Sequence, residues 1–409
     1  MTGHAQAPGS AIAFARRNVL LLTVAQALLG AAGPVAFAVG GVSGYQLLGP
    51  DKSLATAPLT GFNVGVALGA MLIAALSQHL GRKLSFIMGA LLGIAGSGIA
   101  AVALFNENFW LFALGLCFLG LAGGFAQKIR FAAADVSPAL YKPIAISWIL
   151  AGGIVSAVLG PQLVILAKDF FAPVLFAGAF VALIPVFAVA IAVLAFLTLR
   201  DLKPGGQAAS NEPARPLREI VTTQRFVTGL VCGISTYALM TFMMTGAPIA
   251  MVIECGFSSE LATLGIQWHV LAMIAPSFFT GMLITRFGPE KIVAAGLLIL
   301  MACAALAHAG ITLFNFWGAL ILLGLGWNFG FIGSTAIIAS SYRPHEADKV
   351  QGFHDIVLFT FVALASFASG KVLTSYGWNM LNTVFWPVTI ICLSLVMLLM
   401  RKERRLPAP

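Results

Sequence analysis

Twelve long apolar segments dominate this sequence and decide what it can fold into. Each has about 20 or more residues, enough for an α-helix to cross roughly 30 Å of hydrocarbon. A transmembrane barrel would instead need alternating strands of about ten residues. The predicted spans are 18–44, 57–78, 83–105, 109–131, 142–167, 173–199, 226–251, 259–283, 290–312, 315–341, 352–375 and 379–400.

Composition and charge agree with a membrane protein. Hydrophobic residues make up 60% of the 409 residues and charged residues only 9%, which is too little polar surface to coat a water-soluble globule. Most Lys and Arg fall in the connections on one side of the spans, and only Lys52, Lys168 and Lys371 fall on the other. The positive-inside rule then places both termini in the cytoplasm. The basic residues form no stripe with interleaved aromatics, so we expect no nucleic-acid partner.

One long polar stretch divides the chain. Residues 200–225 are rich in Pro, Gly and charged residues, which is typical of a linker. We therefore expect five parts: a cytoplasmic tail over 1–17, a six-helix bundle over 18–199, a cytoplasmic linker over 200–225, a second bundle over 226–400 and a cytoplasmic tail over 401–409.

The two halves carry matching motifs. The loop LSQHLGRK at 76–83 corresponds to LITRFGPEK at 283–291, with Gly81 and Gly288 207 positions apart. Leu-Gly-Leu recurs at 119–121 and 323–325. The loops resemble the GxLxxRxGRK loop of the major facilitator superfamily, although Gln78 stands where an aspartate is usual. This resemblance implies an all-α integral membrane protein with twelve transmembrane helices in two pseudo-symmetric six-helix bundles around a central cavity.

The resemblance also implies a function. A major facilitator is a secondary active transporter that moves a small organic solute by alternating access, here with protons as the expected coupling ion and the monomer as the expected state. Residues 130–135, 245–251, 267–269 and 275–281 resemble a largely uncharacterised bacterial subgroup that includes proposed riboflavin transporters, so we expect import of a flavin-like or other planar metabolite. A proton-coupled drug or metabolite efflux pump is the alternative, and a transporter-derived sensor or scaffold is a second one. Cys117 stands where drug antiporters usually carry an arginine, which weakens the efflux alternative.

Charged residues at the cytoplasmic mouth are candidates for a gate. In the first half, Arg82 and Lys83 can pair with Asp135 when the cavity closes, and Lys142 completes the acidic-to-basic pattern of the family. In the second half, we expect Arg286 and Lys291 to pair with Glu346 or Asp348. The alternative is that these residues are solvated anchors that only fix orientation.

Ionisable side chains inside the spans are costly and therefore candidates for ion coupling. His269 lies about mid-span, and histidine titrates most readily near neutral pH. A neutral histidine that links two helices is the alternative. Asp355 and Arg130 are further coupling candidates, and we expect Asp355 to pair with Lys128, Arg130 or Lys142. Because neighbours on a helix point about 100° apart, we expect His354 and Asp355 not to pair with each other.

Polar and aromatic side chains within the spans are the candidates for solute contact. Enzymatic function is not expected, because neither a nucleophile triad nor a phosphate loop is present. The five cysteines are scattered, so neither a metal nor any other cofactor is expected. The substrate-binding candidates are Gln26, Asn63, Gln127, Trp148, Tyr237, Thr241, Gln267, Trp268, His269, Trp327 and Asn328.

Overall fold

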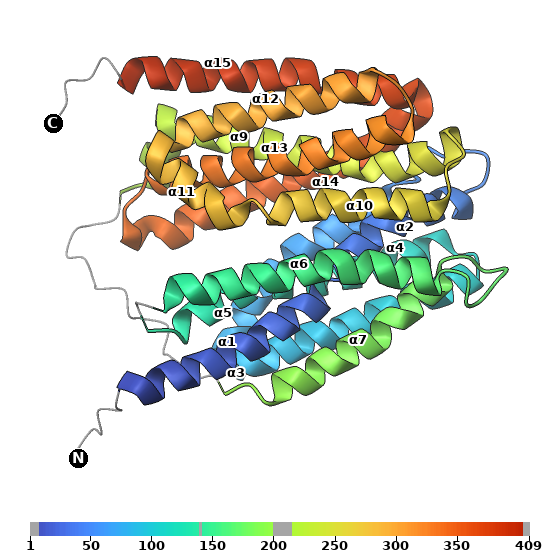
Figure 1. Cartoon of the computed structure of the whole chain (residues 1–409), viewed down its shortest axis with the longest axis horizontal. Coiled ribbons are helices and arrows are strands. Elements are labelled where there is room, and N and C mark those ends of the chain that lie inside the picture. The colour runs from blue at the N-terminus through green and yellow to red at the C-terminus, as the bar shows by residue number, and fades with distance from the viewer. Residues whose placement is uncertain (1–7, 139–140, 199–214, 404–409) are drawn as a thin grey trace. The chain divides into compact units, whose positions relative to one another are not determined.

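The protein is helical wherever its structure is described. The computed structural model describes residues 8–138, 141–198 and 215–403, and every regular element in those ranges is a helix. The predicted linker segment 200–214 and the ends 1–7 and 404–409 lie outside the described residues. The helices are α1 (Pro8–Leu29), α2 (Ala32–Leu47), α3 (Ala57–Phe105), α4 (Phe109–Ala126), α5 (Ile129–Asp135), α6 (Lys142–Ala167), α7 (Ala177–Ala195), α8 (Leu217–Val221), α9 (Gln224–Ile249), α10 (Ser259–Ile274), α11 (Ser277–Phe287), α12 (Pro289–His308), α13 (Leu313–Ala339), α14 (Ala347–Thr383) and α15 (Phe385–Glu403), with the π-helix η1 (Ala250–Glu254) and the 3-10 helix η2 (Pro344–Glu346) (Figure 1).

Ten stretches of the described residues are long and apolar enough to cross a membrane when the bent pair α10–α11 is counted as one. Two of them, α3 and the stretch 349–402, have 49 and 54 residues, and each covers two of the predicted spans. Both contain a glycine with positive φ, at Gly81 (76°) and Gly377 (73°), where the helix is kinked. The predicted count of twelve spans is compatible with these breaks.

The two repeated loops have the same backbone geometry. Gly81 has φ 76° and ψ 161°, and Gly288 has φ 87° and ψ 149°. Side chains other than glycine rarely adopt this region, so a glycine is needed where each loop turns the chain. The match predicted from sequence between the two loops is thus present in the structure.

The helices group into two compact units, which are described separately. Unit 1 comprises Met1–Gly40 and Gly61–Pro204, and unit 2 comprises Gly41–Thr60 and Gly205–Pro409. In unit 1, α1 packs on α6 and α7. Gly120 of α4 lies so close to α3 that a Cβ atom there would be 2.0 Å from the carbonyl oxygen of Phe62, so only glycine permits this approach.

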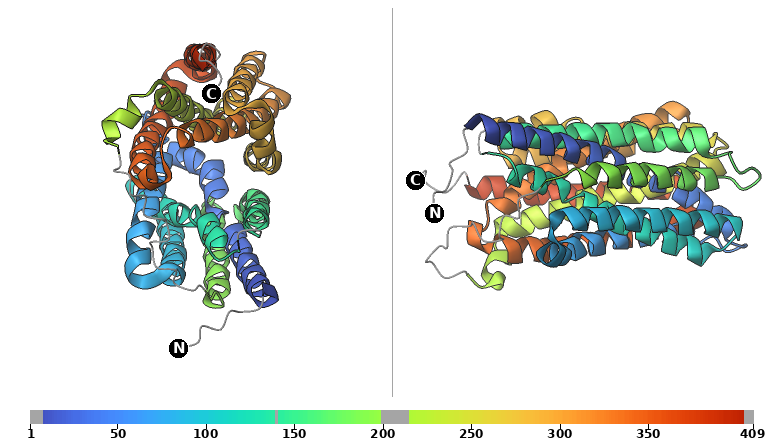
Figure 2. Two further views of the ribbon diagram at one scale, coloured as in Figure 1. Left: turned by 90° about the vertical axis from the view of Figure 1, so that its left-hand side faces the viewer. Right: turned by 90° about the horizontal axis from the view of Figure 1, so that it is seen from below.

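Unit 2 is organised around α9 and α13. Helix α13 packs on α9, α10 and α12, while α14 packs on α9, and these helices run alongside one another (Figure 2). A buried cluster joins α9, α12, α13 and α15 through residues that include Cys232, Val293, Ile337 and Val396. Residues 41–60, from the end of α2 to the start of α3, belong to this unit.

Candidate functional site

Four aromatic rings from three helices form a cluster in unit 2. Tyr237 comes from α9, Trp327 and Phe331 from α13, and Phe359 from α14. Trp327 and Phe331 are four residues apart and therefore share a helix face, and their rings stack with centroids 5.1 Å apart and planes 19° apart. Tyr237 meets both edge-on, at 5.5 and 5.1 Å. Such a set of rings suits contact with a planar aromatic solute.

Buried polar atoms without hydrogen-bond partners lie on two of these helices, α9 and α13. Among the described residues, the indole nitrogen Nε1 of Trp327 and the hydroxyls of Thr236, Thr241 and Ser334 are buried and make no hydrogen bond. Buried polar groups are normally paired, because leaving one unpaired costs about 1–3 kcal/mol. Thr241 follows Tyr237 by one helical turn. A Cβ atom at Gly330 would lie 2.7 Å from the Thr236 hydroxyl, so that group faces the contact between α9 and α13, and Trp327 and Thr241 remain the candidates for contact with a solute.

Asn328, by contrast, is fully engaged between helices. Its Oδ1 accepts a hydrogen bond from Thr280 Oγ1 at 2.6 Å, and its Nδ2 donates to the Met273 carbonyl at 2.8 Å and to Ser277 Oγ at 2.6 Å. These partners flank the 41° bend between α10 and α11, where Pro276 supplies no N–H. Asn328 thus stabilises this bend, and its predicted solute contact stays a prediction.

His269 lies at the contact between α10 and α13. The side chain is completely buried, and Nδ1 lies 2.8 Å from the Leu320 carbonyl oxygen, to which it donates. This tautomer leaves Nε2 with a lone pair, and that atom has no hydrogen-bond partner in the described residues. Gln267 is also buried, whereas Trp268 is exposed, so the three neighbours do not share one face.

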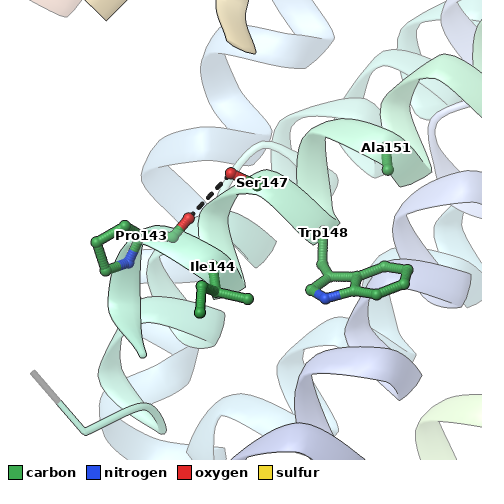
Figure 3. Close-up of a pocket in the computed structure, with 5 residues that line it drawn as sticks. All are labelled: Pro143, Ile144, Ser147, Trp148 and Ala151. Carbon is green, nitrogen blue, oxygen red and sulfur yellow. Dashed lines mark hydrogen bonds between the residues drawn. The ribbon is translucent and has the colours of Figure 1, made fainter. Parts of the chain in front are cut away.

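The candidates of unit 1 are more dispersed. Asn63 is buried on α3, Gln26 is half-buried on α1, and Gln127 is exposed at the end of α4. Trp148 lines a cavity of about 420 Å³ along one face of α6, together with Pro143, Ile144, Ser147 and Ala151 (Figure 3). The hydroxyl of Ser147 already donates a hydrogen bond to the Pro143 carbonyl at 3.1 Å. The other side chains of this cavity are mainly apolar.

The predicted ion pair of the first half is present. Arg82 and Asp135 lie 2.6 Å apart and connect α3 to the end of α5. Lys83 donates to the carbonyl oxygen of Ala195 at 2.5 Å, and Lys142 is exposed. The gate role of these residues stays a prediction.

The predicted partner of Glu346 is wrong. Its buried carboxylate binds Arg215, with Nη2 at 2.7 Å from Oε2 and Nε at 3.0 Å from Oε1. These bonds hold the pKa of Glu346 well below its ordinary value. Arg286 instead lies over the Phe287 ring, Lys291 is exposed, and the Asp348 side chain lies outside the described part. A cation 131 positions away in sequence could not be identified from the local pattern.

The expectation for His354 and Asp355 is also wrong. His354 Nδ1 lies 3.0 Å from Asp355 Oδ1, because the two side chains bend toward each other although their Cβ atoms diverge. Arg130, in unit 1, lies with its guanidinium 4.8 Å from the Phe131 ring centroid. The predicted ion pair of Asp355 with Lys128, Arg130 or Lys142 would join the two units and stays a prediction.

The aromatic partners of Tyr237 and Trp327 were missed from sequence. Phe331 and Phe359 are two of 31 phenylalanines, and residue type alone does not distinguish them from the others. The spacing of four residues between Trp327 and Phe331 was the available signal. Within the described residues, no group of three or more His, Cys, Asp or Glu side chains could hold a metal ion.

Two bacterial transporters align with nearly the whole chain. It is 45% identical over 387 residues to the riboflavin transporter RfnT of Brucella anthropi, a match that covers 95% of this chain and 96% of that protein. It is 28% identical over 396 residues to the uncharacterized MFS-type transporter YdeG of Bacillus subtilis, covering 93% and 91% of the two chains.

Solved structures share the fold. The nucleoside transporter NupG aligns with a TM-score of 0.71 at 13% identity, over 94% of this chain and 99% of that one. A D-xylose-proton symporter aligns with a TM-score of 0.69 at 12% identity, over 94% and 97%. The Major Facilitator Superfamily profile matches residues 7–357 and, in a second match, 230–409. With its repeated loops, helical units and full-length relatives, the chain belongs to the Major Facilitator Superfamily.

Proposed function

We propose that this transporter carries riboflavin or a closely related flavin into the bacterial cell, coupled to protons. The observation that carries the proposal is the 45% identity, over 95% of the chain, to a riboflavin transporter. At this level of similarity over the full length, the residues that contact solute are expected to be largely shared.

The aromatic cluster of unit 2 suits this solute. The flavin ring system is planar and has carbonyl oxygens and ring nitrogens at its edge. Trp327, Phe331 and Tyr237 would contact the faces and edges of this ring system, and the unpaired indole N–H of Trp327 would donate to a carbonyl oxygen. Thr241 would supply a hydroxyl one turn further along α9.

Transport would proceed by alternating access. In transporters of this kind, two related halves rock around a site near the middle of the membrane. The Arg82–Asp135 pair would stabilise one of the two states by holding α3 to α5 at the cytoplasmic mouth. Protons would enter the cycle through His269, whose Nε2 atom is unpaired.

Uptake in oriented vesicles tests the function. Right-side-out membrane vesicles that contain the protein should accumulate riboflavin, followed by its fluorescence, when an inward proton gradient is imposed. The same vesicles should not accumulate it when the proton gradient is directed outward. Absence of riboflavin movement under either gradient would refute the substrate, and accumulation driven only by an outward proton gradient would establish proton antiport, and thus efflux, instead.

Substitution of Trp327 tests the site. Trp327→Leu removes the stacking surface and should raise the KM for riboflavin about tenfold, since an aromatic stack contributes on the order of 1–3 kcal/mol. Trp327→Phe keeps a ring and should give a smaller increase. Trp110 is 67% exposed on α4, so Trp110→Leu is the matched control and should leave the KM unchanged. Equal KM values for all three variants would exclude Trp327 from the site.

A further inference from the structure

A second cavity lies at the opposite end of unit 2 from the linker. Helix α9 begins near the linker at Gln224, and the cavity lies where it ends, beside the connection from α2 to α3 and the last third of α14. Its volume is about 350 Å³, within the range of about 300–1,000 Å³ typical of small-molecule sites. With both termini cytoplasmic, this end faces the outside of the cell.

The walls of this outer cavity differ in chemistry. Asp51, Glu254 and Ser375 line it with oxygen atoms, whereas Ile249, Ile253 and Leu373 line it with hydrocarbon. Glu254 is exposed, and its carboxyl group makes no hydrogen bond or ion pair with any described residue. Such a lining suits a bound molecule whose carbon chain carries hydroxyl groups.

The one cationic side chain in the lining is already engaged. The Lys52 ammonium donates to the carbonyl oxygens of Tyr45 and Leu48, each at 2.7 Å, and lies 4.5 Å from the centroid of the Tyr45 ring. Helix α2 ends at Leu47, so Lys52 satisfies carbonyls that this helix end leaves unpaired. Its charge therefore stabilises the helix end.

The two carboxyl groups of the lining differ in their environments. Asp51 Oδ1 accepts the backbone N–H of Ser53 at 2.9 Å, which holds the pKa of Asp51 below its ordinary value. Glu254 ends the π-helix η1, where Cys255 donates to the Ala250 carbonyl at 2.9 Å, and partial burial raises the pKa of Glu254 above its ordinary value. Two carboxylates repel an anion and accept hydrogen bonds from hydroxyl groups.

The walls are held in place by close helix packing. Thr56 Oγ1 donates to the Phe367 carbonyl at 3.4 Å, and a Cβ atom at Gly370 would lie 2.4 Å from that hydroxyl. The start of α3 is thus fixed against α14 within unit 2. A cavity with fixed walls loses little freedom when it binds a solute.

We propose that the outer cavity binds a neutral polyhydroxylated chain and excludes the phosphorylated form of the same chain. Asp51 and Glu254 would accept hydrogen bonds from the hydroxyls, while the carbon backbone lies against Ile253 and Leu373. That this chain is the ribityl group of a flavin rests on the proposed function, whereas the polyol chemistry does not. The cavity would then select riboflavin over its phosphate ester before transport.

Thermal unfolding of the purified protein with ribitol tests the binding chemistry directly. Ribitol should raise the Tm of the unmodified protein, since a ligand that binds the folded state stabilises it, and phosphorylated ribitol should not. Glu254→Gln and Asp51→Asn each keep the shape and remove one charge, and each should weaken ribitol binding about tenfold, the worth of a charge-assisted hydrogen bond. Glu107→Gln removes an exposed charge from the connection after α3 and should behave like the unmodified protein.

The results separate this inference from the proposed function. Equal stabilisation by ribitol and phosphorylated ribitol, or unchanged ribitol binding by Glu254→Gln, would refute the proposed role of the outer cavity. If Asp51→Asn lowers the Tm without ligand, the substitution has disturbed the turn at Asp51. In that case the ribitol binding of Glu254→Gln alone decides whether the proposal holds. Riboflavin transport that phosphorylated riboflavin inhibits equally well would also refute the cavity and leave the function standing. Ribitol binding with the expected selectivity but without riboflavin transport would refute only the function.

Discussion

The Arg82–Asp135 pair, which we propose lies at the cytoplasmic mouth, is a weak contact when judged by stability alone. The two side chains are 38% and 39% exposed, so water screens their attraction and the pair contributes only about 0–1 kcal/mol to stability. A contribution of that size cannot hold a fold together. It can, however, shift the populations of two transport states that differ by a few kcal/mol.

Asp135→Asn should therefore change the transport cycle more than the stability. Loss of the charge should favour the state that is open to the cytoplasm and slow riboflavin turnover several-fold, with less than about 1 kcal/mol of destabilisation. Reactivity of a cysteine at the cytoplasmic mouth measures the first effect, and uptake rates measure the second. Asp169→Asn, at a carboxylate paired with its neighbour Lys168, is the control. Unchanged reactivity and turnover would leave Arg82 and Asp135 only as anchors.

Individual residues were predictable from sequence where the pattern is local. Arg82 and Asp135 were paired correctly because each stands in a short motif of the family that the sequence resembles. Glu346 was assigned the wrong partner because Arg215 reaches it from the linker, and no periodicity connects the two. The cost of an intramembrane charge identified His269 but could not reveal its bond to Leu320, which depends on how α10 and α13 pack.

At the scale of elements, the end of the linker is attached to unit 2. The backbone N–H of Arg215 donates to Glu346 at 2.9 Å, and Lys349 donates to the Arg215 carbonyl. Helix α8 then packs through Ile220 into a buried cluster with Phe226, Ile338 and Val350. This attachment fixes the point at which the linker enters unit 2.

Glu346→Gln should release this attachment. The pKa of Glu346 is lowered by its bonds to Arg215, so the stabilisation is fully present above the ordinary pKa of 4.5 and is lost as the pH falls through the lower folded value. The unmodified protein should therefore show no change in linker attachment between about pH 5 and 8. Limited trypsin digestion at the exposed Arg218 measures it, and cleavage should be faster in Glu346→Gln. Equal cleavage rates would show that α8 is held by its apolar contacts alone.

Helix breaks were predictable where two predicted spans meet, as at Gly81 and Gly377, and where glycine sits in the repeated loop. The turns at Gly81 and Gly288 were expected from the repeated loops. The predicted span 18–44 is instead divided into α1 and α2, and the predicted span 259–283 is bent at Pro276. The π-helix η1 has no sequence signature in the apolar run that contains it. The hydropathy of a segment indicates whether it is long enough to cross the membrane, but not whether its helix is continuous.

At the scale of the whole molecule, orientation follows from charge. A chain with a cysteine at an exposed site of a connection reports the side on which that connection lies. In a variant without the five native cysteines, a membrane-impermeant thiol reagent added to intact cells should label Asn106→Cys, after α3, and should not label Thr222→Cys, before α9. After the cells are opened, both should react. The opposite labelling pattern would reverse the topology and move the outer cavity to the cytoplasmic side.

Proton coupling is the second proposed property of the whole molecule that can be tested. His269 donates through Nδ1 to Leu320 and keeps Nε2 free to accept a proton, so His269→Gln preserves a donor to Leu320 but removes the titrating group. Uphill accumulation of riboflavin and its pH dependence should be lost, while downhill exchange persists. His308→Gln is the matched control, because His308 is exposed at the end of α12 and hydrogen-bonded at both ring nitrogens. Uphill transport with an unchanged pH profile in His269→Gln would make His269 a link between α10 and α13, and would shift the proton to Asp355 and His354, which lie 3.0 Å apart.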